Sequence, residues 1–414
     1  MARKVVLMTL GTRGDVQPYL ALGQGLKHAG FDVTLATDAN FANDARNHGL
    51  EFAPVRADFR AIVESPEGRA ALTGDPRAIL RLVRHTVLPM THDLLEDFRM
   101  AADGAAAIIY HPKAIAAPHL AEATGIPTWA GFFLPMLSPT RDFPIPILTS
   151  RSLGGLGNRL SYRFLDISTL FLAGIVNRWR RESLGLMHRM PRGFERQLPV
   201  LYGFSRHVIP PPADWGEQVH VTGYWFLDEP PGWQPPDELA RFLAAGPPPV
   251  YVGFGSMSSR DPAETARTVF EAVRLAGCRA IVSEGWGGLS AGHVPDDVLA
   301  IQDVPHSWLF RQVAAVVHHG GAGTTAAAIR AGKPSIVCPF VADQPFWGHQ
   351  VHKLGIGPKP IRQRRLRAGN LAGAIERAVN DKEMQSRALE LGEKVAAEDG
   401  VARAVEIFSR LWHS

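Results

Sequence analysis

Residues 315–350 constrain the fold of this chain more than any other stretch of its sequence. The apolar run at 313–317, rich in β-branched residues, is typical of a buried parallel strand. A glycine-rich turn follows, and then an alanine-rich segment that ends before Gly332 and Pro334, as a short helix does. The order of strand, glycine-rich turn and helix predicts an α/β unit.

The turn between this strand and this helix is suited to binding an anion. The first turn of a helix carries unpaired N–H groups and a partial positive charge, and glycines let the backbone approach a bulky ligand closely. A tight turn without a ligand is the alternative, and the paired histidines favour the ligand. We therefore expect a diphosphate to contact His318, Gly321, Ala322, Gly323 and Thr324.

A second strand pattern, at 335–338, is followed by Asp343 and Gln344. Parallel strands end at the same edge of a sheet, which is where open α/β sheets bind ligands. A carboxylate and an amide there can form paired hydrogen bonds to vicinal hydroxyls. Together with the diphosphate site, they indicate a sugar attached to a diphosphate.

The motifs HHGGAGTT and PFVADQPFWG resemble the donor-binding signature of nucleotide-sugar-dependent glycosyltransferases of family 1. The resemblance continues through GTRGDVQP, VGFGSM and DVPHSWLF, and it extends to the sterol glucosyltransferases and bacterial natural-product glycosyltransferases. It implies the α/β GT-B fold, in which two Rossmann-like domains with parallel sheets face each other.

The length and composition fit two domains. The chain has 414 residues, 46% of them apolar, which is enough for two cores. The formal net charge of +4 gives no reason to expect a nucleic acid partner. The two cysteines form no disulfide framework, and neither a signal peptide nor an apolar run of about 18 residues is present, so we expect a cytoplasmic protein.

The domain boundaries follow from proline-rich stretches and from the resemblance. We expect an acceptor-binding domain at 1–208, a linker at 209–236, a donor-binding domain at 237–395 and a C-terminal helix at 396–414. The resemblance implies that this last helix crosses back to the first domain.

Hydrophobic patterning predicts the regular elements between these boundaries. Residues 133–158 are irregular in pattern, and 159–184 have the spacing of an amphipathic helix. Two helices are expected nearer the N-terminus, at 18–29 and 114–124. The other expected strands are 4–10, 31–37, 107–110, 128–132, 200–202, 249–254, 280–283 and 298–301.

Asp15 is the leading candidate for the general base. It lies in the loop after the first expected strand, and its alternative role is that of an N-cap for the helix near Pro18. Many relatives carry histidine at this position and an orienting aspartate after a later strand, a position that corresponds to His111 here. The resemblance thus implies an inverted pair, Asp15 with His111, while a histidine that only forms hydrogen bonds is the alternative.

Further contacts are implied for the donor and the acceptor. Gly255 and Ser256 should meet the diphosphate from its other side, and Val304 and Trp286 should hold the uracil. Plant members carry a ribose-binding glutamate where this chain has Ala326, so ribose recognition departs from the family pattern. The apolar acceptor site should include Phe132, Phe133 and Met136, which could equally be ordinary core residues.

No metal or cofactor is expected, because the sequence has no Asp-x-Asp motif. The helix N-terminus and His318 would stabilise the leaving diphosphate instead. The predicted function is an inverting, metal-independent transfer of a hexose, glucose from UDP-glucose, to a hydroxyl of an apolar acceptor such as a sterol or polyketide.

Two other functions compete with this prediction. One is a sugar-nucleotide epimerase of the same fold, and the other is a non-catalytic helper protein of a natural-product pathway. The expected partners are a nucleotide sugar and an apolar small molecule, with peripheral membrane contact if the acceptor is a lipid. The expected state is a monomer or a weak homodimer.

Overall fold

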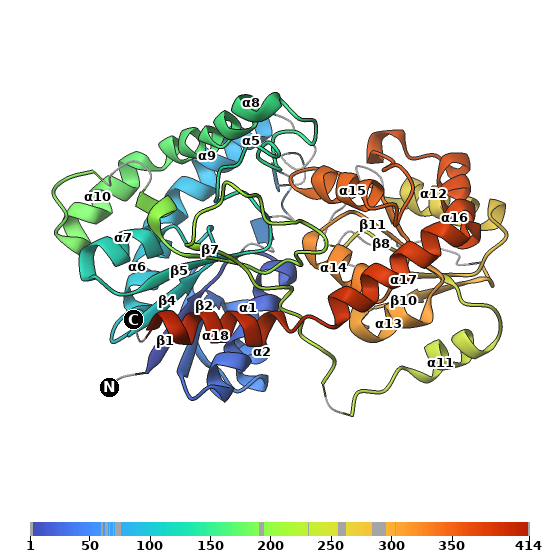
Figure 1. Ribbon diagram of the computed structural model, residues 1–414, viewed down its shortest axis with the longest axis horizontal. Coiled ribbons are helices and arrows are strands. Elements are labelled where there is room, and N and C mark those ends of the chain that lie inside the picture. The colour runs from blue at the N-terminus through green and yellow to red at the C-terminus, as the bar shows by residue number, and fades with distance from the viewer. Residues whose placement is uncertain are drawn as a thin grey trace. The chain divides into compact units, whose positions relative to one another are not determined.

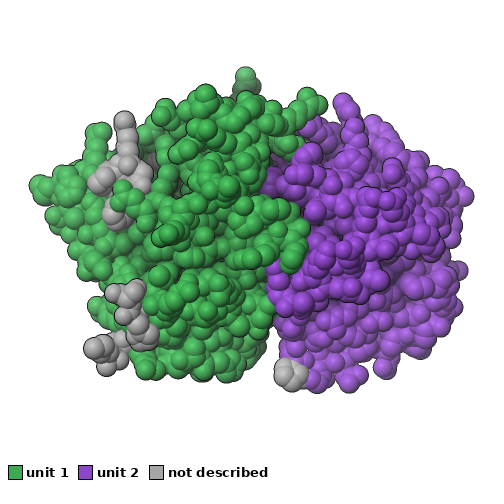
Figure 2. Space-filling view, viewed as in Figure 1, with its two compact units in different colours: residues 1–227, 399–414 green, residues 228–398 purple. Residues whose placement is uncertain are grey.

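The chain folds into two compact units in the computed structural model (Figure 2). Unit 1 comprises Met1–Leu227 and Asp399–Ser414, and unit 2 comprises Asp228–Glu398. The residues that the structure describes are 3–58, 61–62, 65, 67–68, 70, 76–189, 194–230, 232–255, 262–283, 295–302 and 304–412.

Unit 1 is built on a seven-stranded sheet with the order β3-β2-β1-β4-β5-β6-β7, and all of its strand pairs are parallel. Its strands are β1 (Lys4–Met8), β2 (Asp32–Asp38), β3 (Glu51–Val55), β4 (Ala107–Tyr110), β5 (Thr128–Phe132), β6 (Val200–Tyr202) and β7 (Val219–Val221). The sequence did not predict β3 and β7. Pro54 interrupts the pattern of β3, and β7 is too short to show a period.

The helices of unit 1 follow the sequence patterns only in part: the helix expected from Pro18 begins at Arg13, the one expected from Ala114 begins at Ala116, and the expected helix at 159–184 is broken. They are α1 (Arg13–His28), α2 (Ala42–Asn47), α5 (Pro76–Leu82), α6 (Leu88–Ala101), α7 (Ala116–Thr124), α8 (Gly154–Ser161), α9 (Arg163–Ser168), α10 (Ala173–Leu184) and α18 (Gly400–Trp412). The single helix expected at 159–184 is therefore wrong in detail, because a 3-10 turn, η3 (Thr169–Phe171), separates α9 from α10.

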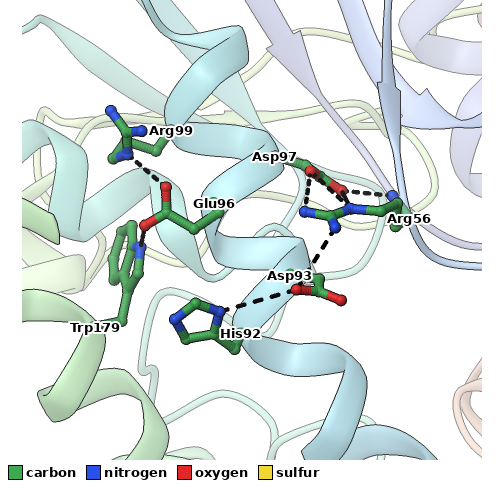
Figure 3. A network of polar contacts seen from close by, with 7 residues as sticks. All are labelled: Arg56, His92, Asp93, Glu96, Asp97, Arg99 and Trp179. Atoms are coloured by element: carbon green, nitrogen blue, oxygen red, sulfur yellow. Dashed lines mark hydrogen bonds and ion pairs between the residues drawn. The ribbon is translucent and has the colours of Figure 1, made fainter. Parts of the chain in front are cut away.

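Helix α6 is hydrogen-bonded both to Arg56, the residue that follows β3, and to Trp179 of helix α10 (Figure 3). The buried carboxylate of Asp97 accepts hydrogen bonds from the Arg56 backbone N–H at 2.7 Å and from Arg56 Nη2 at 2.8 Å. The residue directly before Asp97, Glu96, accepts a hydrogen bond at Oε1 from Trp179 Nε1 of α10 at 2.8 Å. The Glu96–Trp179 bond fixes α10 to α6, and the Asp97–Arg56 bonds fix α6 to the residue that follows β3.

Helix α18, the last helix of the chain, packs on unit 1. A Cβ placed on Gly25 of α1 would lie 2.4 Å from Val401 Cγ1, so the two helices approach closely. The Phe408 ring lies 5.3 Å from that of Phe31 and 4.8 Å from that of Trp129 between ring centroids, and Phe408 is fully buried. The final helix therefore completes the core of the first unit.

Unit 2 has a five-stranded parallel sheet with the order β10-β9-β8-β11-β12. Its strands are β8 (Val250–Gly253), β9 (Ala280–Ser283), β10 (Val298–Ile301), β11 (Ala315–His318) and β12 (Ser335–Val337). Its helices are α11 (Asp237–Ala244), α12 (Pro262–Leu275), α13 (His306–Gln312), α14 (Ala322–Arg330), α15 (Gln344–Lys353), α16 (Ala368–Asn380) and α17 (Lys382–Ala396).

In both sheets all strands are parallel, but the order in which the chain adds them reverses at one point. In unit 1 the strand order runs outward from β1 to β3 and resumes on the other side with β4. In unit 2 it runs outward from β8 to β10 and resumes with β11. The loops that follow the two strands at such a switch point leave in opposite directions and open a crevice, which is where ligands bind. The expected fold class, two Rossmann-like domains with parallel sheets, is confirmed.

Among the helices of the described ranges, none is both long and apolar enough to cross a membrane.

Candidate functional site at two sheet switch points

Asp15 lies at the switch point of unit 1, in the first turn of α1. Thr12 precedes the helix, and its backbone N–H donates to Asp15 Oδ2 at 2.9 Å. Asp15 is therefore the third residue of the helix and not its N-cap, because α1 begins at Arg13, well before Pro18. The carboxylate remains partly accessible, with 20% of its side chain exposed.

His111, in the loop after β4, lies beside Asp15. The distance from His111 Nε2 to Asp15 Oδ1 is 3.4 Å, and only 1% of the histidine side chain is exposed. His111 Nδ1 accepts the backbone N–H of Lys113 at 3.1 Å. In the neutral ring the proton is therefore on Nε2, the ring nitrogen that lies 3.4 Å from the carboxylate. The two residues that the resemblance paired are brought together.

Lys113, which sequence reasoning missed, is the third member of this group. Its Nζ lies 2.9 Å from Asp15 Oδ1. Space for the group depends on Gly11, where φ is +135° and a Cβ would lie 2.1 Å from Asp15 Oδ2. The available signal was the position of Lys113, two residues after His111 in the same loop.

The charges around Asp15 keep it ionised. Burial raises the pKa of Asp15, but the Lys113 ammonium and the neighbouring His111 imidazole outweigh burial and hold this pKa well below its usual range. Burial also lowers the pKa of His111, although Asp15 opposes that shift. Near neutral pH the group is thus a carboxylate flanked by a neutral imidazole and an ammonium.

Two of the three residues predicted to bind an acceptor, Phe132 and Phe133, have rings near that of His111. The ring of Phe132 lies 4.9 Å from that of His111 between centroids, and Phe132 is partly exposed. Phe133 packs between Tyr19 and Trp225 and is buried, as is Met136. Contact of all three with an acceptor remains a prediction, and Phe132 is the best placed of them.

In unit 2, the N-terminus of α14 lies at the switch point. Gly321 is the N-cap and offers no side-chain hydrogen bond to the first turn, which Ala322, Gly323 and Thr324 form. Because the N-cap residue supplies no side-chain hydrogen bond to the N–H groups of that turn, these groups are available to donate to an anion. Helix α17 packs against α14. A Cβ placed on Gly392 of α17 would lie 2.7 Å from the Cα of Gly332, which follows α14, so the two segments approach closely.

The side chains of the two adjacent histidines at this turn lie in different environments. His318, the last residue of β11, is fully buried, and its Nδ1 accepts the N–H of Gly320 at 3.1 Å. His319 is only partly buried and lies next to two glycines. A Cβ on Gly321 would be 2.5 Å from His319 Nε2, and one on Gly255 would be 3.0 Å from its Cε1. His319, absent from the predicted site, thus lies between the turns after β8 and β11.

Both histidines are neutral at physiological pH. Burial and the neighbouring His319 and His306 hold the pKa of His318 well below its usual value. Burial, together with His306, lowers the pKa of His319 to about 4. His306 itself is bound near β8, with its Nε2 3.3 Å from Tyr251 Oη. Neutral imidazoles here can donate a hydrogen bond without carrying a charge.

The Asp343–Gln344 pair follows β12, where α15 begins. Gln344 Oε1 accepts the N–H of Phe340 at 2.8 Å, so this side chain shapes the loop. Asp343 Oδ2 accepts the Trp347 indole N–H at 3.1 Å. In the loop between β12 and α15, Ala342 has a φ of 57°, a left-handed conformation that costs about 1–2 kcal/mol in a non-glycine residue. Such strain concentrates where a structure positions a functional side chain.

The remaining predicted donor contacts divide into two groups. Gly255 lies two residues after the end of β8, with φ at +60°, and Val304 is partly buried just before α13. Ser256 and Trp286 lie outside the described residues.

Two family models match the chain. Residues 5–138 match the Glycosyltransferase family 28 N-terminal domain. Residues 272–411 match the Erythromycin biosynthesis protein CIII-like, C-terminal domain. The first range contains the Asp15 group, and the second contains the α14 turn.

Curated relatives match nearly the whole chain. The sterol 3-beta-glucosyltransferase UGT80B1 of Arabidopsis thaliana is 38% identical over 98% of this chain and 68% of its own length. A sterol 3-beta-glucosyltransferase of Emericella nidulans is 39% identical over 98% of this chain. The chain spans only 30% of the length of that fungal relative.

Solved structures share the fold at low identity. The glycosyltransferase of kitacinnamycin is similar with a TM-score of 0.71, 21% identity and coverage of 98% of both chains. The calicheamicin glycosyltransferase CalG4 has a TM-score of 0.69 and 20% identity, covering 99% of this chain and 98% of its own. With the 38% identical plant relative, these matches place the chain in a family: it belongs to the GT-B glycosyltransferases, in the family that includes the sterol 3-beta-glucosyltransferases.

Proposed function

We propose that the chain is an inverting, metal-independent glycosyltransferase that moves glucose from UDP-glucose to a hydroxyl group of an apolar acceptor such as a sterol. The observation that carries the proposal is the Asp15–His111 contact of 3.4 Å at the switch point of unit 1. The relatives that are 38% and 39% identical, both named as sterol 3-beta-glucosyltransferases, support the choice of sugar and acceptor.

In the proposed reaction Asp15 is the general base. The acceptor hydroxyl donates its proton to the Asp15 carboxylate while its oxygen bonds to the anomeric carbon. The bond from that carbon to the diphosphate breaks, and its electron pair leaves with UDP. One displacement inverts the anomeric configuration. Because a carboxylate is a weak base for an alcohol, the proton moves late, as the sugar departs.

His111 and Lys113 have supporting roles in this mechanism. The Nε2–H group of His111 faces Asp15, so the imidazole orients the carboxylate and does not need to take the substrate's proton. The Lys113 ammonium, 2.9 Å away, keeps Asp15 ionised before the acceptor arrives. Transfer requires this group to meet the donor bound at unit 2.

The leaving diphosphate is assigned to the turn before α14. The uncapped N–H groups of its first turn and the neutral His319 imidazole would donate to the phosphate oxygens. This arrangement stabilises developing negative charge with oriented donors. We assign this contact to His319 rather than His318 because His318 is fully buried and already binds Gly320.

A product assay tests the proposal. Purified protein is incubated with UDP-glucose or TDP-glucose and a panel of sterols, flavonoids and macrolides, with products read by mass spectrometry and the anomeric configuration by NMR. A β-glucoside of a sterol, formed equally well in EDTA, is expected. Loss of activity in EDTA with recovery on adding magnesium or manganese contradicts metal independence. Conversion of UDP-glucose to another UDP-hexose without acceptor would indicate an epimerase.

The role of Asp15 has its own test. Asp15→Asn preserves the shape of the side chain and removes its basicity, so transfer should fall by about 100-fold or more while UDP binding and thermal stability are retained. His111→Ala should cost less, and the double variant should lose less than the sum because the residues act as one unit. Wild-type transfer by Asp15→Asn would place the base elsewhere.

A further inference from the structure

An exposed apolar stripe runs along α8, α9 and η3, which follow one another at one edge of unit 1 in Figure 1. Its side chains recur three or four residues apart, the spacing of one helical face. Each is between 42% and 70% exposed. We define the apolar stripe as Leu153, Leu156, Leu160, Phe164, Ile167 and Phe171.

On the buried side of this segment, Asn158 of α8 and Tyr162, which lies between α8 and α9, are hydrogen-bonded to the rest of unit 1. Asn158 is 1% exposed, and its Nδ2 donates to the Arg141 carbonyl at 2.8 Å. Tyr162 is also 1% exposed, and its Oη donates to the Pro135 carbonyl at 3.3 Å. Turning the stripe inward would break both bonds, so the sequence holds it toward solvent.

The segment that carries the stripe is also fixed at its C-terminal end. In α10, the buried Trp179 donates to Glu96 at 2.8 Å, as Figure 3 shows. The next residue, Arg180, is buried and pairs with Glu122 at 2.7 Å. The stripe is therefore exposed on a segment that is fixed to the rest of unit 1.

The charges beside the stripe have one dominant sign. Residues 148–171 contain three arginines and one aspartate as their charged residues. That aspartate, Asp166, pairs with Arg196 at 2.6 Å. Arg151 and Arg163 are exposed on the same segment. A helical face of Leu, Ile and Phe with arginines beside it matches helices that lie in the interface of anionic membranes.

We propose that the apolar stripe docks unit 1 onto the surface of an anionic phospholipid bilayer, with its side chains among the acyl chains and its arginines at the headgroups. The buried face of the same helices is bonded to the segment after β5 that follows Phe132. In this respect the inference rests on the proposed function: docking would place the acceptor-binding residues next to the phase in which a sterol dissolves.

The first experiment measures flotation of the full chain with vesicles that contain no sterol, so its outcome does not depend on activity. Leu156→Ser combined with Phe171→Ser should weaken binding to phosphatidylcholine–phosphatidylserine vesicles by about tenfold or more, since binding scales with buried apolar area. The matched control, Met100→Ser with Leu275→Ser, removes two apolar side chains that are exposed elsewhere and should bind as the wild type does. Leu160→Ser with Ile167→Ser repeats the test if the first pair alters the melting curve.

The second experiment tests the charges. Wild-type binding should fall on pure phosphatidylcholine vesicles and at high salt, because the attraction to anionic headgroups is screened. Arg151→Gln with Arg163→Gln should remove the preference for phosphatidylserine. Arg362→Gln with Arg365→Gln changes the net charge equally at another exposed site and should retain that preference.

Three results overturn the inference. The first is no flotation of the wild type, and the second is equal flotation of the wild type and both stripe variants. The third is a wild-type dimer by light scattering that the stripe variants abolish without any vesicle binding, which would make the stripe a contact between copies. If vesicles bind as expected but no sterol glucoside forms in the product assay, the proposed function fails and the docking surface stands.

Discussion

At the residue scale, the ammonium group of Lys113 controls how Asp15 titrates. Replacing it with methionine removes the charge that holds the pKa of Asp15 well below its usual range, while burial continues to raise that pKa. The pKa of Asp15 therefore rises in the variant. Its carboxylate begins to take up protons at a higher pH, where it stops acting as a base.

The expected result is a new acid limb in the pH profile of kcat/KM for Lys113→Met. The wild type should show no such limb above the pH at which it unfolds, because its Asp15 stays ionised. Lys113→Arg, which preserves the charge, is the control and should resemble the wild type. Superimposable profiles for Lys113→Met and the wild type would show that Lys113 does not act on the base.

A second residue-scale prediction concerns the recognition of the sugar. Asp343→Ala removes a carboxylate that can bind sugar hydroxyls, and it also leaves the buried Trp347 indole without its acceptor, at a cost of about 1–3 kcal/mol. Transfer should weaken more than UDP binding, as measured by kinetics and calorimetry. Trp347→Phe breaks the same hydrogen bond and preserves the carboxylate, so it should retain sugar recognition. Equal losses in both variants would assign Asp343 a structural role only.

The sequence predicted some of these residues and missed others for physical reasons. Asp15 was predictable because it follows a strand that the pattern identifies, and His111 because the family resemblance points to the loop after a later strand. Such loops meet at a switch point. Lys113 carries no pattern of its own, and only the fold shows which way it points. His318 and His319 are adjacent, and since side chains alternate along a strand, only one of them can face the core. The sequence does not say which one.

At the scale of elements, the N-terminus of α14 offers a paired test. His319→Ala should lower turnover by about 100-fold and weaken UDP binding while the fold is retained, because it removes one donor to the diphosphate. His318→Ala should instead destabilise the protein, by about 2–4 kcal/mol, because it empties a fully buried position and frees the Gly320 N–H. Kinetics and melting curves separate the two effects. Full activity of His319→Ala would move the diphosphate away from this turn.

The helices also show what hydrophobic spacing does not predict. The spacing at 159–184 revealed an apolar face correctly but not that part of this face lies in solvent, because periodicity does not say what covers a face. The break at η3 was also hidden, since Thr169–Phe171 has helical spacing and differs only in its tighter turn. Strands such as β4, β5 and β9 were predictable because they are short apolar runs bounded by turns.

At the scale of the whole molecule, buried neutral histidines in both units make stability depend on pH. His119 in unit 1 and His319 in unit 2 have pKa values lowered to about 4, chiefly by burial, against 6.5 for an ordinary histidine. The unfolded chain thus binds more protons than the folded one between about pH 6.5 and 4. The free energy of unfolding should fall as the pH decreases through this window, by up to about 3 kcal/mol for each group.

Denaturant unfolding at pH 7.5, 6, 5 and 4.5 measures this effect. His119→Gln removes one titrating group, and its stability should change less with pH than that of the wild type. The comparison has to be made within the variant's own series, because the substitution also disturbs the 2.9 Å contact of His119 Nδ1 with Arg180. A flat stability curve for the wild type above pH 4.5 would contradict the prediction.

The return of the chain to unit 1 through α18 has a consequence for how the protein is made. Unit 2 is one continuous segment, Asp228–Glu398, while unit 1 needs residues from both sides of it. A ribosome therefore delivers all of unit 2 before the helix that covers Phe31 and Trp129. Unit 1 therefore cannot complete its core around Phe31 and Trp129 until Phe408 has been made, after the whole of unit 2.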